Sequence, residues 1–299
     1  MKTGREIGRA LVCILAASSV LPGLPARGKC QEVSPQEFAP GIVSTGHEFG
    51  ISFTADGEEA YFSRFEAKQP IHIFRTRLAN GVWQEPEKLS ISSDAWSDLD
   101  PFVSPDGKQL FFVSTRPDAG KIPENNKNDM DIWVATRSGV EWSAPHRLEN
   151  VNSGGKEGSP SVARDGTLYF FSDRQAGNGK NALYESRFVK GHYEPAMLLP
   201  AAINAGPSDT SPFIARNDKT LLFYSTREGG LGKADLYVSY KKHGKWIASV
   251  NLGSVINSAD SEYDPAVSPD GQELFFGRNS RLYMIPTAAV TGLGSKRFR

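Results

Sequence analysis

Residues 261–276 read SEYDPAVSPDGQELFF, and this stretch decides the fold. An acidic residue and a proline open one apolar run, Asp270 and Gly271 form a turn, and a second apolar run follows. Asp-Gly between two apolar runs is a strong hairpin signal, because both residues tolerate the positive φ of a tight hairpin turn. We expect Pro265 at the first residue of its strand, where a proline removes no ladder hydrogen bond.

The same stretch occurs five times along the chain. A third apolar run with an aromatic residue follows each copy, and the first four copies have a fourth run with its own aromatic residue. The acidic residues that open the copies are Glu48, Asp98, Glu157, Asp209 and Glu262, and the fourth-run aromatics are Trp83, Trp142, Tyr193 and Trp246. Four short strands in each repeat of about 50 residues are typical of a β-propeller blade.

The fifth copy lacks a fourth run, whereas residues 38–43 precede the first copy without a partner of their own. We expect residues 38–43 to complete the fifth blade, so that strand pairing closes the ring and leaves no open edge. The predicted fold is therefore all-β, a five-bladed β-propeller of four-stranded antiparallel blades over residues 36–287. A degenerate sixth blade is the alternative, and residues 288–299 are predicted to be a C-terminal tail.

Residues 1–28 are predicted to be a cleaved signal peptide. Basic residues precede an apolar stretch that prolines interrupt before it is long enough to span a bilayer. An uncleaved anchor and a lipid on Cys30 are the alternatives. Cleavage leaves at most one of the two cysteines, which excludes an internal disulfide. We expect a periplasmic or secreted protein with no transmembrane span after cleavage.

Composition argues against several classes of function. Lys and Arg together number 34, as do Asp and Glu, so the net charge is zero and no basic stripe suggests a nucleic-acid partner. The sequence has no histidine pair at metal spacing, no cysteine-rich zinc pattern, no phosphate-binding glycine loop and no nucleophile elbow. We therefore expect a monomer that needs no cofactor and no metal.

Three stretches carry a family resemblance. Residues 102–112 and 267–276, each with Val-Ser-Pro-Asp-Gly before a Phe-Phe pair, resemble the WD40-like repeat of the TolB family of periplasmic propellers. Residues 225–253 resemble a variant of this repeat found in bacterial envelope proteins. The resemblance covers residues 36–287 and implies the fold and an extracytoplasmic location. It implies no activity, because the family is mostly non-catalytic and the propeller fold hosts many functions.

The first strand of each blade should line the central channel, so its acidic first residue should lie at one mouth. An arginine that follows each second strand should reach the same level. These arginines are Arg64, Arg116, Arg174, Arg227 and Arg278. Repetition in all five blades favours a structural ring of carboxylate–arginine pairs that fixes blade register. The alternative is a Ca²⁺ site built from converging oxygen ligands, against which the arginines count.

Residues that break the repeat at this mouth are the better guide to function. The candidate ligand-binding residues are His47, Trp96, Asp100, Lys156, Tyr263 and Asp264. A polar insertion, Pro117 to Met130, is expected on the same face. We predict a non-catalytic binding scaffold for an envelope protein or a glycan. The alternative is a glycoside hydrolase or lyase that uses Asp100 and Asp264 as acid and base, about 5–10 Å apart.

Overall fold

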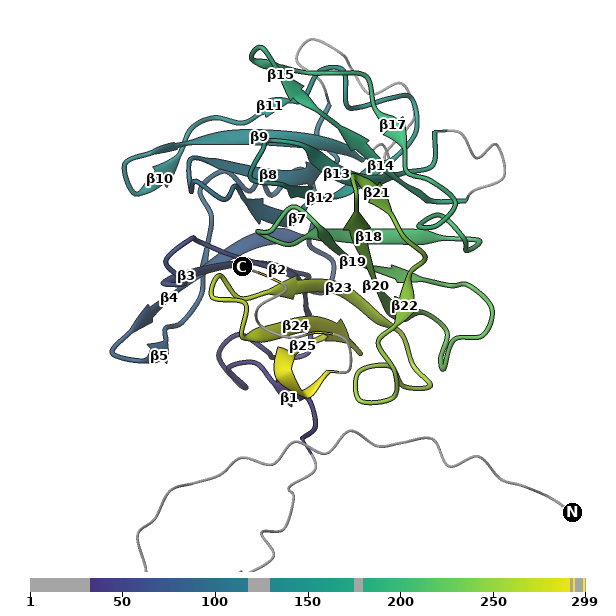
Figure 1. Ribbon diagram of the computed structural model, residues 1–299. Coiled ribbons are helices and arrows are strands. Elements are labelled where there is room, and N and C mark those ends of the chain that lie inside the picture. The colour runs from purple at the N-terminus through teal and green to yellow at the C-terminus, as the bar shows by residue number, and fades with distance from the viewer. Residues whose placement is uncertain (1–32, 118–129, 175–179, 291–292, 294–297, 299) are drawn as a thin grey trace, which may run out of the picture.

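The structure is a computed structural model that describes residues 33–117, 130–174, 180–290, 293 and 298. The predicted signal peptide, Cys30 and all but the ends of the insertion Pro117–Met130 lie outside these residues. In the described part, five antiparallel sheets surround a common axis (Figure 1), and the predicted five-bladed propeller is confirmed. No helix within the described ranges is long and apolar enough to cross a membrane.

The blades follow one another along the chain. Blade one contains β2 (Glu48–Phe53), β3 (Glu59–Arg64), β4 (His72–Ala79), β5 (Val82–Trp83) and β6 (Glu87–Lys88), and blade two contains β7 (Asp98–Val103), β8 (Gln109–Ser114), β9 (Asp131–Ser138), β10 (Glu141–Trp142) and β11 (His146–Arg147). Blade three contains β12 (Glu157–Val162), β13 (Leu168–Ser172), β14 (Ala182–Ser186) and β17 (Met197–Leu198), with β15 (Phe188–Val189) and β16 (His192–Tyr193) as a separate pair.

Blade four contains β18 (Asp209–Ile214), β19 (Thr220–Ser225), β20 (Asp235–Lys242), β21 (Lys245–Trp246) and β22 (Val250–Asn251). Blade five contains β23 (Glu262–Val267), β24 (Glu273–Arg278), β25 (Arg281–Pro286) and the N-terminal β1 (Gln36–Glu37), and a 3-10 turn, η1 (Thr287–Ala289), follows it. The first strands β2, β7, β12, β18 and β23 contact one another in this order, and β23 contacts β2, so they form the innermost wall.

The predicted Asp-Gly turns join the two inner strands of four blades. Gly57, Gly107, Gly166 and Gly271 have φ of 73–88°, which only glycine adopts without strain. In blade four the same position is occupied by Asp218, with φ of 56°. These five hairpins lie at one end of the channel, which we call the hairpin face; the opposite end is the entrance face.

Pro265 does not begin its strand, as expected, but lies in a β-bulge within it. The strand starts at Glu262, and the pairing register shifts between Tyr263 and Ala266, so that Asp264 and Pro265 have no ladder partner. The proline therefore still costs no hydrogen bond. The first strands of all five blades have a register shift at the same place.

The fourth run of blades one to four is two short strands rather than one, whereas β1 alone completes blade five. The aromatic residue lies in a two-residue hairpin strand, and a second two-residue strand pairs further back on the third strand, as Trp142 and His146 show in blade two. The aromatic side chain packs on the preceding blade: Trp142 lies 5.9 Å from the Tyr61 ring. Trp246 is placed in the same way, 6.2 Å from the Tyr169 ring. The fourth-run aromatics thus join neighbouring blades.

An N-terminal strand closes the ring, as predicted, but with different residues. β1 pairs with β25, and the Phe38 N–H donates to the Leu282 carbonyl at 2.8 Å, so the pairing strand begins before residues 38–43 (Figure 1). The pairing ends there because Phe38 turns into the core, 5.1 Å from the Phe275 ring. Ala39 then has a positive φ of 42°, and Pro40 has no N–H to donate.

Candidate functional site

The structure brings the five predicted ring carboxylates together with the five predicted arginines, one pair in each blade. The Arg64, Arg116, Arg174, Arg227 and Arg278 guanidinium groups lie 2.7–3.0 Å from Glu48, Asp98, Glu157, Asp209 and Glu262. The carboxylates are buried, and the arginines keep a small part of their surface exposed. An arginine pair at this distance is a charge-assisted hydrogen bond.

Each arginine also makes two contacts that the sequence analysis missed. In blade four, Arg227 donates to the Ile203 carbonyl at 2.7 Å, and its guanidinium lies 4.5 Å above the Tyr237 ring. Equivalent carbonyl and ring contacts recur in the other blades. We call each set of carboxylate, arginine and aromatic ring a clamp. Because the carbonyl belongs to the connection from the preceding blade, a clamp joins two blades.

The clamp carboxylates have further donors. Glu48 accepts hydrogen bonds from the Thr45 backbone and hydroxyl at 2.7 and 2.5 Å and from the backbone of Gly46 at 3.0 Å. Burial raises the pKa of Glu48, but these hydrogen bonds and the charge of Arg64 outweigh it and lower the pKa below its usual value. The clamp carboxylates therefore have no free oxygen directed at a ligand.

A second ring lies in the channel, two residues after the clamp carboxylates, at the β-bulges. We call it the pore ring; its members, one from each blade, are Gly50, Asp100, Ser159, Ser211 and Asp264. All five have left-handed backbone conformations, with φ of 47–58°. Glycine adopts this conformation freely, and aspartate tolerates it better than most residues do. The bulge therefore explains part of the residue choice at this position.

Serine hydroxyls connect the two pore-ring carboxylates. Ser159 Oγ donates to Asp100 Oδ2 at 2.8 Å, Ser211 Oγ donates to Asp264 Oδ1 at 2.5 Å, and the two hydroxyl oxygens are 3.5 Å apart. On the other side of the ring, Gly50 lies between the two carboxylates, and a Cβ added to it would be 3.2 Å from Asp100 Oδ1. Neighbouring members of the pore ring are thus in contact all around the channel, and the side chains among them are polar.

The two pore-ring carboxylates have unusual protonation behaviour. Burial raises the pKa of Asp100, and burial together with the charge of Asp100 raises the pKa of Asp264 to about 7. Within the described ranges, neither forms an ion pair with a lysine or an arginine. Two like charges in one confined site disfavour joint ionisation, so the pair retains a proton near neutral pH.

The channel is filled just beyond the pore ring. Phe102 and Phe213 project into it from opposite sides, with ring centroids 6.4 Å apart in a T-shaped contact. Both line the entrance hollow and also the hollow on the hairpin face, so they separate the two. The entrance hollow has an empty volume of about 340 Å³, its open mouth included.

The other predicted ligand residues lie outside the entrance hollow. His47 is exposed, with its ring edge-on to Phe65 at 5.0 Å, and Lys156 is also exposed. Trp96 is half-buried in the connection before β7. Tyr263 is half-buried, and its hydroxyl accepts a hydrogen bond from the Ser280 N–H at 2.8 Å. None of these four lines the hollow that the pore ring forms.

The ring of Tyr263 covers Gly277 on the neighbouring strand. A Cβ added to Gly277 would lie 2.2 Å from this ring, closer than atoms can approach. We expect Gly277→Ala to cost about 1–3 kcal/mol of unfolding free energy through overpacking, measured by chemical denaturation. Tyr263→Ala in the same chain should recover part of the loss. An additive loss in the double variant would contradict the contact.

The described residues contain no group of three or more histidine, cysteine, aspartate or glutamate side chains that could hold a metal ion. The pore ring supplies two carboxylates and two hydroxyls, and each hydroxyl already donates to one of the carboxylates. The clamp carboxylates cannot add to this set, because arginines bind them.

Comparisons with known proteins support the fold. No family model matches the chain, and no curated protein matches it. Solved structures that resemble it include TolB from Acinetobacter baumannii, with 17% identity over 83% of this chain and 55% of that chain, at a TM-score of 0.49. They also include putative TolB from Agrobacterium tumefaciens, with 15% identity over 77% and 69% of the two chains, at a TM-score of 0.50.

A GH43 endo-arabinanase from Bacillus licheniformis is also similar, with 12% identity over 82% of this chain and 94% of that chain, at a TM-score of 0.53. This chain spans about half the length of the Acinetobacter baumannii TolB. Identities this low show a shared propeller fold and leave the function to be argued from the site.

Proposed function

We propose that this protein is an exported, non-catalytic binding scaffold that takes an envelope protein or a glycan on its entrance face. One observation carries the proposal: every carboxylate of the clamps and the pore ring already has hydrogen-bond partners within the chain. Arginines hold the five clamp carboxylates, and serine hydroxyls hold Asp100 and Asp264. A catalytic carboxylate must instead face its substrate.

The entrance face supports binding in another way. Exposed His47 and Lys156 and half-buried Trp96 precede the first strands of three different blades, which supports a binding rim to which several blades contribute. An aromatic ring that is partly exposed to solvent can stack on a sugar or on a partner's side chain. The clamps hold the strands beneath this rim rigidly, which lowers the entropy cost of ordering the rim on binding.

A second candidate, glycoside hydrolysis or lysis, is favoured by the pore ring. Asp100 and Asp264 have no cationic partner among the described residues, and the raised pKa of about 7 at Asp264 suits a general acid. The serine bridge and the phenylalanines below it count against this candidate, because a sugar would have to displace the hydroxyls to come between the two carboxyls.

The test compares two double variants as bait for envelope extract. We expect Trp96→Ala with Lys156→Glu to reduce recovery of the bound protein or glycan by about tenfold, since a few buried or aromatic residues carry most of an interface's energy. The control, Lys108→Glu with Val140→Ala, changes another exposed lysine and an exposed apolar residue elsewhere and should leave recovery unchanged. Equal recovery with all three proteins would refute binding on the entrance face.

The same preparations decide between the two candidates. The scaffold should not cleave arabinan or extracted envelope polysaccharide. Turnover by the unmodified protein that is lost in Asp100→Asn, with folding unchanged, would establish the second candidate in place of the first. A chain that lacks the insertion 117–130 tests whether that segment contributes to capture.

A further inference from the structure

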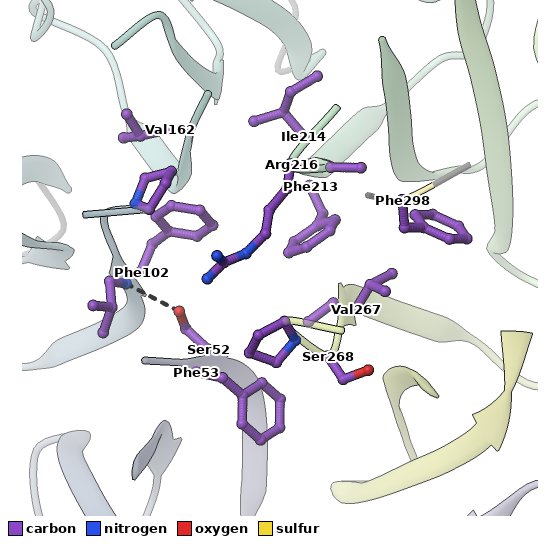
Figure 2. A pocket seen from close by; sticks show the side chains of 15 residues that line it. Ser52, Phe53, Phe102, Val162, Phe213, Ile214, Arg216, Val267, Ser268 and Phe298 are labelled. Carbon is purple, nitrogen blue, oxygen red and sulfur yellow. Dashed lines mark hydrogen bonds between the residues drawn. The ribbon is translucent and has the colours of Figure 1, made fainter. Parts of the chain in front are cut away.

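The hairpin face has a hollow on the propeller axis (Figure 2). Its floor is the pair Phe102 and Phe213, which separates it from the pore ring. Its wall includes Phe53, Val267 and Phe298, and its empty volume is about 510 Å³ with the open mouth included. Apolar side chains dominate the lining, which is typical of a small-molecule pocket.

Arg216 is the one charged residue among the 15 that line this hollow. Figure 2 shows its side chain extending from the wall into the middle of the hollow, toward Phe102 and Ser52. In the described part of the chain, no carboxylate pairs with it and no hydrogen bond engages it. Arg164 is the other described arginine without an ion pair, and Arg164 is exposed, whereas Arg216 is half-buried.

Among the residues that the structure describes, the guanidinium of Arg216 has no counter-charge within ion-pair distance. Burial, and then the nearby charge of Arg164, lower the pKa of Arg216, so its surroundings disfavour the cation. Two aspartates of the hairpin face are engaged by their own turns: the carboxylate of Asp106 accepts hydrogen bonds from its own turn at 2.6 and 3.1 Å. Asp56 does the same at 2.6 and 3.0 Å.

The fold does not require an arginine at this position. Arg216 occupies the first turn position of its hairpin, where blades two and five have Pro105 and Pro269 and blade one has Ala55. All these hairpins have the same turn. The residue two places after this position donates its backbone N–H to the carbonyl of the residue just before it, as Asp218 does to Ala215 at 2.9 Å. Arg216 therefore adds a cation that the turn does not need.

We propose that the hairpin-face hollow binds a carboxylate attached to an apolar body, with Arg216 as the group that recognises the anion. A guanidinium presents two parallel N–H donors that match the two oxygens of a carboxylate. The apolar body would contact Phe53, Val267 and Phe298 on the wall. A free aromatic acid and the C-terminal residue of a peptide share this chemistry, and the inference is independent of the entrance face.

The test is calorimetric titration of the full chain with two probes, 3-phenylpropionate for a free acid and N-acetyl-leucyl-phenylalanine for a peptide terminus. We expect saturable one-to-one binding of at least one probe, and the tighter probe identifies the source. Arg216→Met should weaken this binding by about tenfold or more, since a charged, bidentate pair in an apolar site is lost. The neutral amide 3-phenylpropanamide should bind the unmodified protein as weakly as the acid binds Arg216→Met.

Two controls protect this test against a folding artefact. Arg164→Met removes the exposed arginine from the equivalent turn position and should change the affinity by less than about threefold, because its charge is solvated. Arg216→Met should raise the midpoint of thermal unfolding of the free protein by about 2 °C or more, since an unpaired guanidinium is removed from an apolar site. The proposal would be overturned if neither probe bound saturably, or if the unmodified protein and Arg216→Met bound the tighter probe with equal affinity.

Discussion

Arg227→Met is expected to reduce the free energy of unfolding by about 3–5 kcal/mol, because it leaves a buried carboxylate without its counter-charge. Arg227 donates to Asp209 at 2.8 Å and to Ser249 at 2.6 Å, and Asp209 is only 1% exposed. Chemical denaturation measures the loss. The double variant with Asp209→Asn should recover a large part of it, because no isolated charge then remains.

Arg77→Met provides the matched comparison. Arg77 also pairs with carboxylates, Glu87 at 2.9 Å and Glu59 at 3.2 Å, but its own side chain is 46% exposed. An exposed pair contributes at most about 1 kcal/mol, so the loss should be small. A similar loss in Arg77→Met and Arg227→Met would mean that the clamps do not depend on burial.

Asp264→Asn is expected to stabilise the protein at pH 8 and to change its stability little at pH 4. In the folded protein the carboxyl keeps its proton up to a pH of about 7, whereas in the unfolded chain it loses the proton near its ordinary pKa of about 3.9. The folded state thus binds more protons between these values, so the stability of the unmodified protein falls as the pH rises from about 4 to about 7.

Asparagine has no proton to lose and tolerates the φ of 49° at this position. The variant should therefore be more stable at pH 8 by about 2–4 kcal/mol, since one pKa unit corresponds to about 1.4 kcal/mol. Urea denaturation of both proteins across this pH range measures the difference. A difference that does not change with pH would contradict the raised pKa of Asp264.

Asp106→Asn serves as a control with the opposite sign. Burial raises the pKa of Asp106, but hydrogen bonds from Ser104 and Lys108 outweigh it and lower the pKa. A lowered pKa in the folded state stabilises the protein at neutral pH, and this contribution is lost as the pH falls through that pKa. The variant should therefore be less stable than the unmodified protein at pH 7, and the difference should fade in acid.

The number of blades and the hairpins could be predicted from the sequence because the deciding features are local. Asp270 and Gly271 specify a turn by their own conformational preferences, and the same pair recurs along the chain. The pairing of carboxylates with arginines was also predictable, because strand order alone brings Glu262 and Arg278 to one end of a blade. Each of these inferences needs only the path of the chain.

Features that depend on contacts between blades were not predictable. Ser159 and Ser211 looked unremarkable in the sequence, although they occupy the same repeat position as Asp100 and Asp264. Their importance depends on the bulge, which turns all these side chains into the channel. The turn at residues 216–218 has no glycine, and nothing local in it indicates that its arginine reaches the axis.

The closure of blade five constrains the order of folding. Glu37 of β1 and Arg281 of β25 form an ion pair at 3.0 Å although 244 residues separate them, so this contact has one of the largest sequence separations in the chain. During synthesis β1 emerges before the other strands of the propeller and must wait for β25, which follows all of them. Until β1 docks, the outer edge of β25 has unpaired backbone groups with which strands of other molecules can pair. Docking of β1 closes a very long loop and is therefore slow, and its rate determines how long this edge stays exposed.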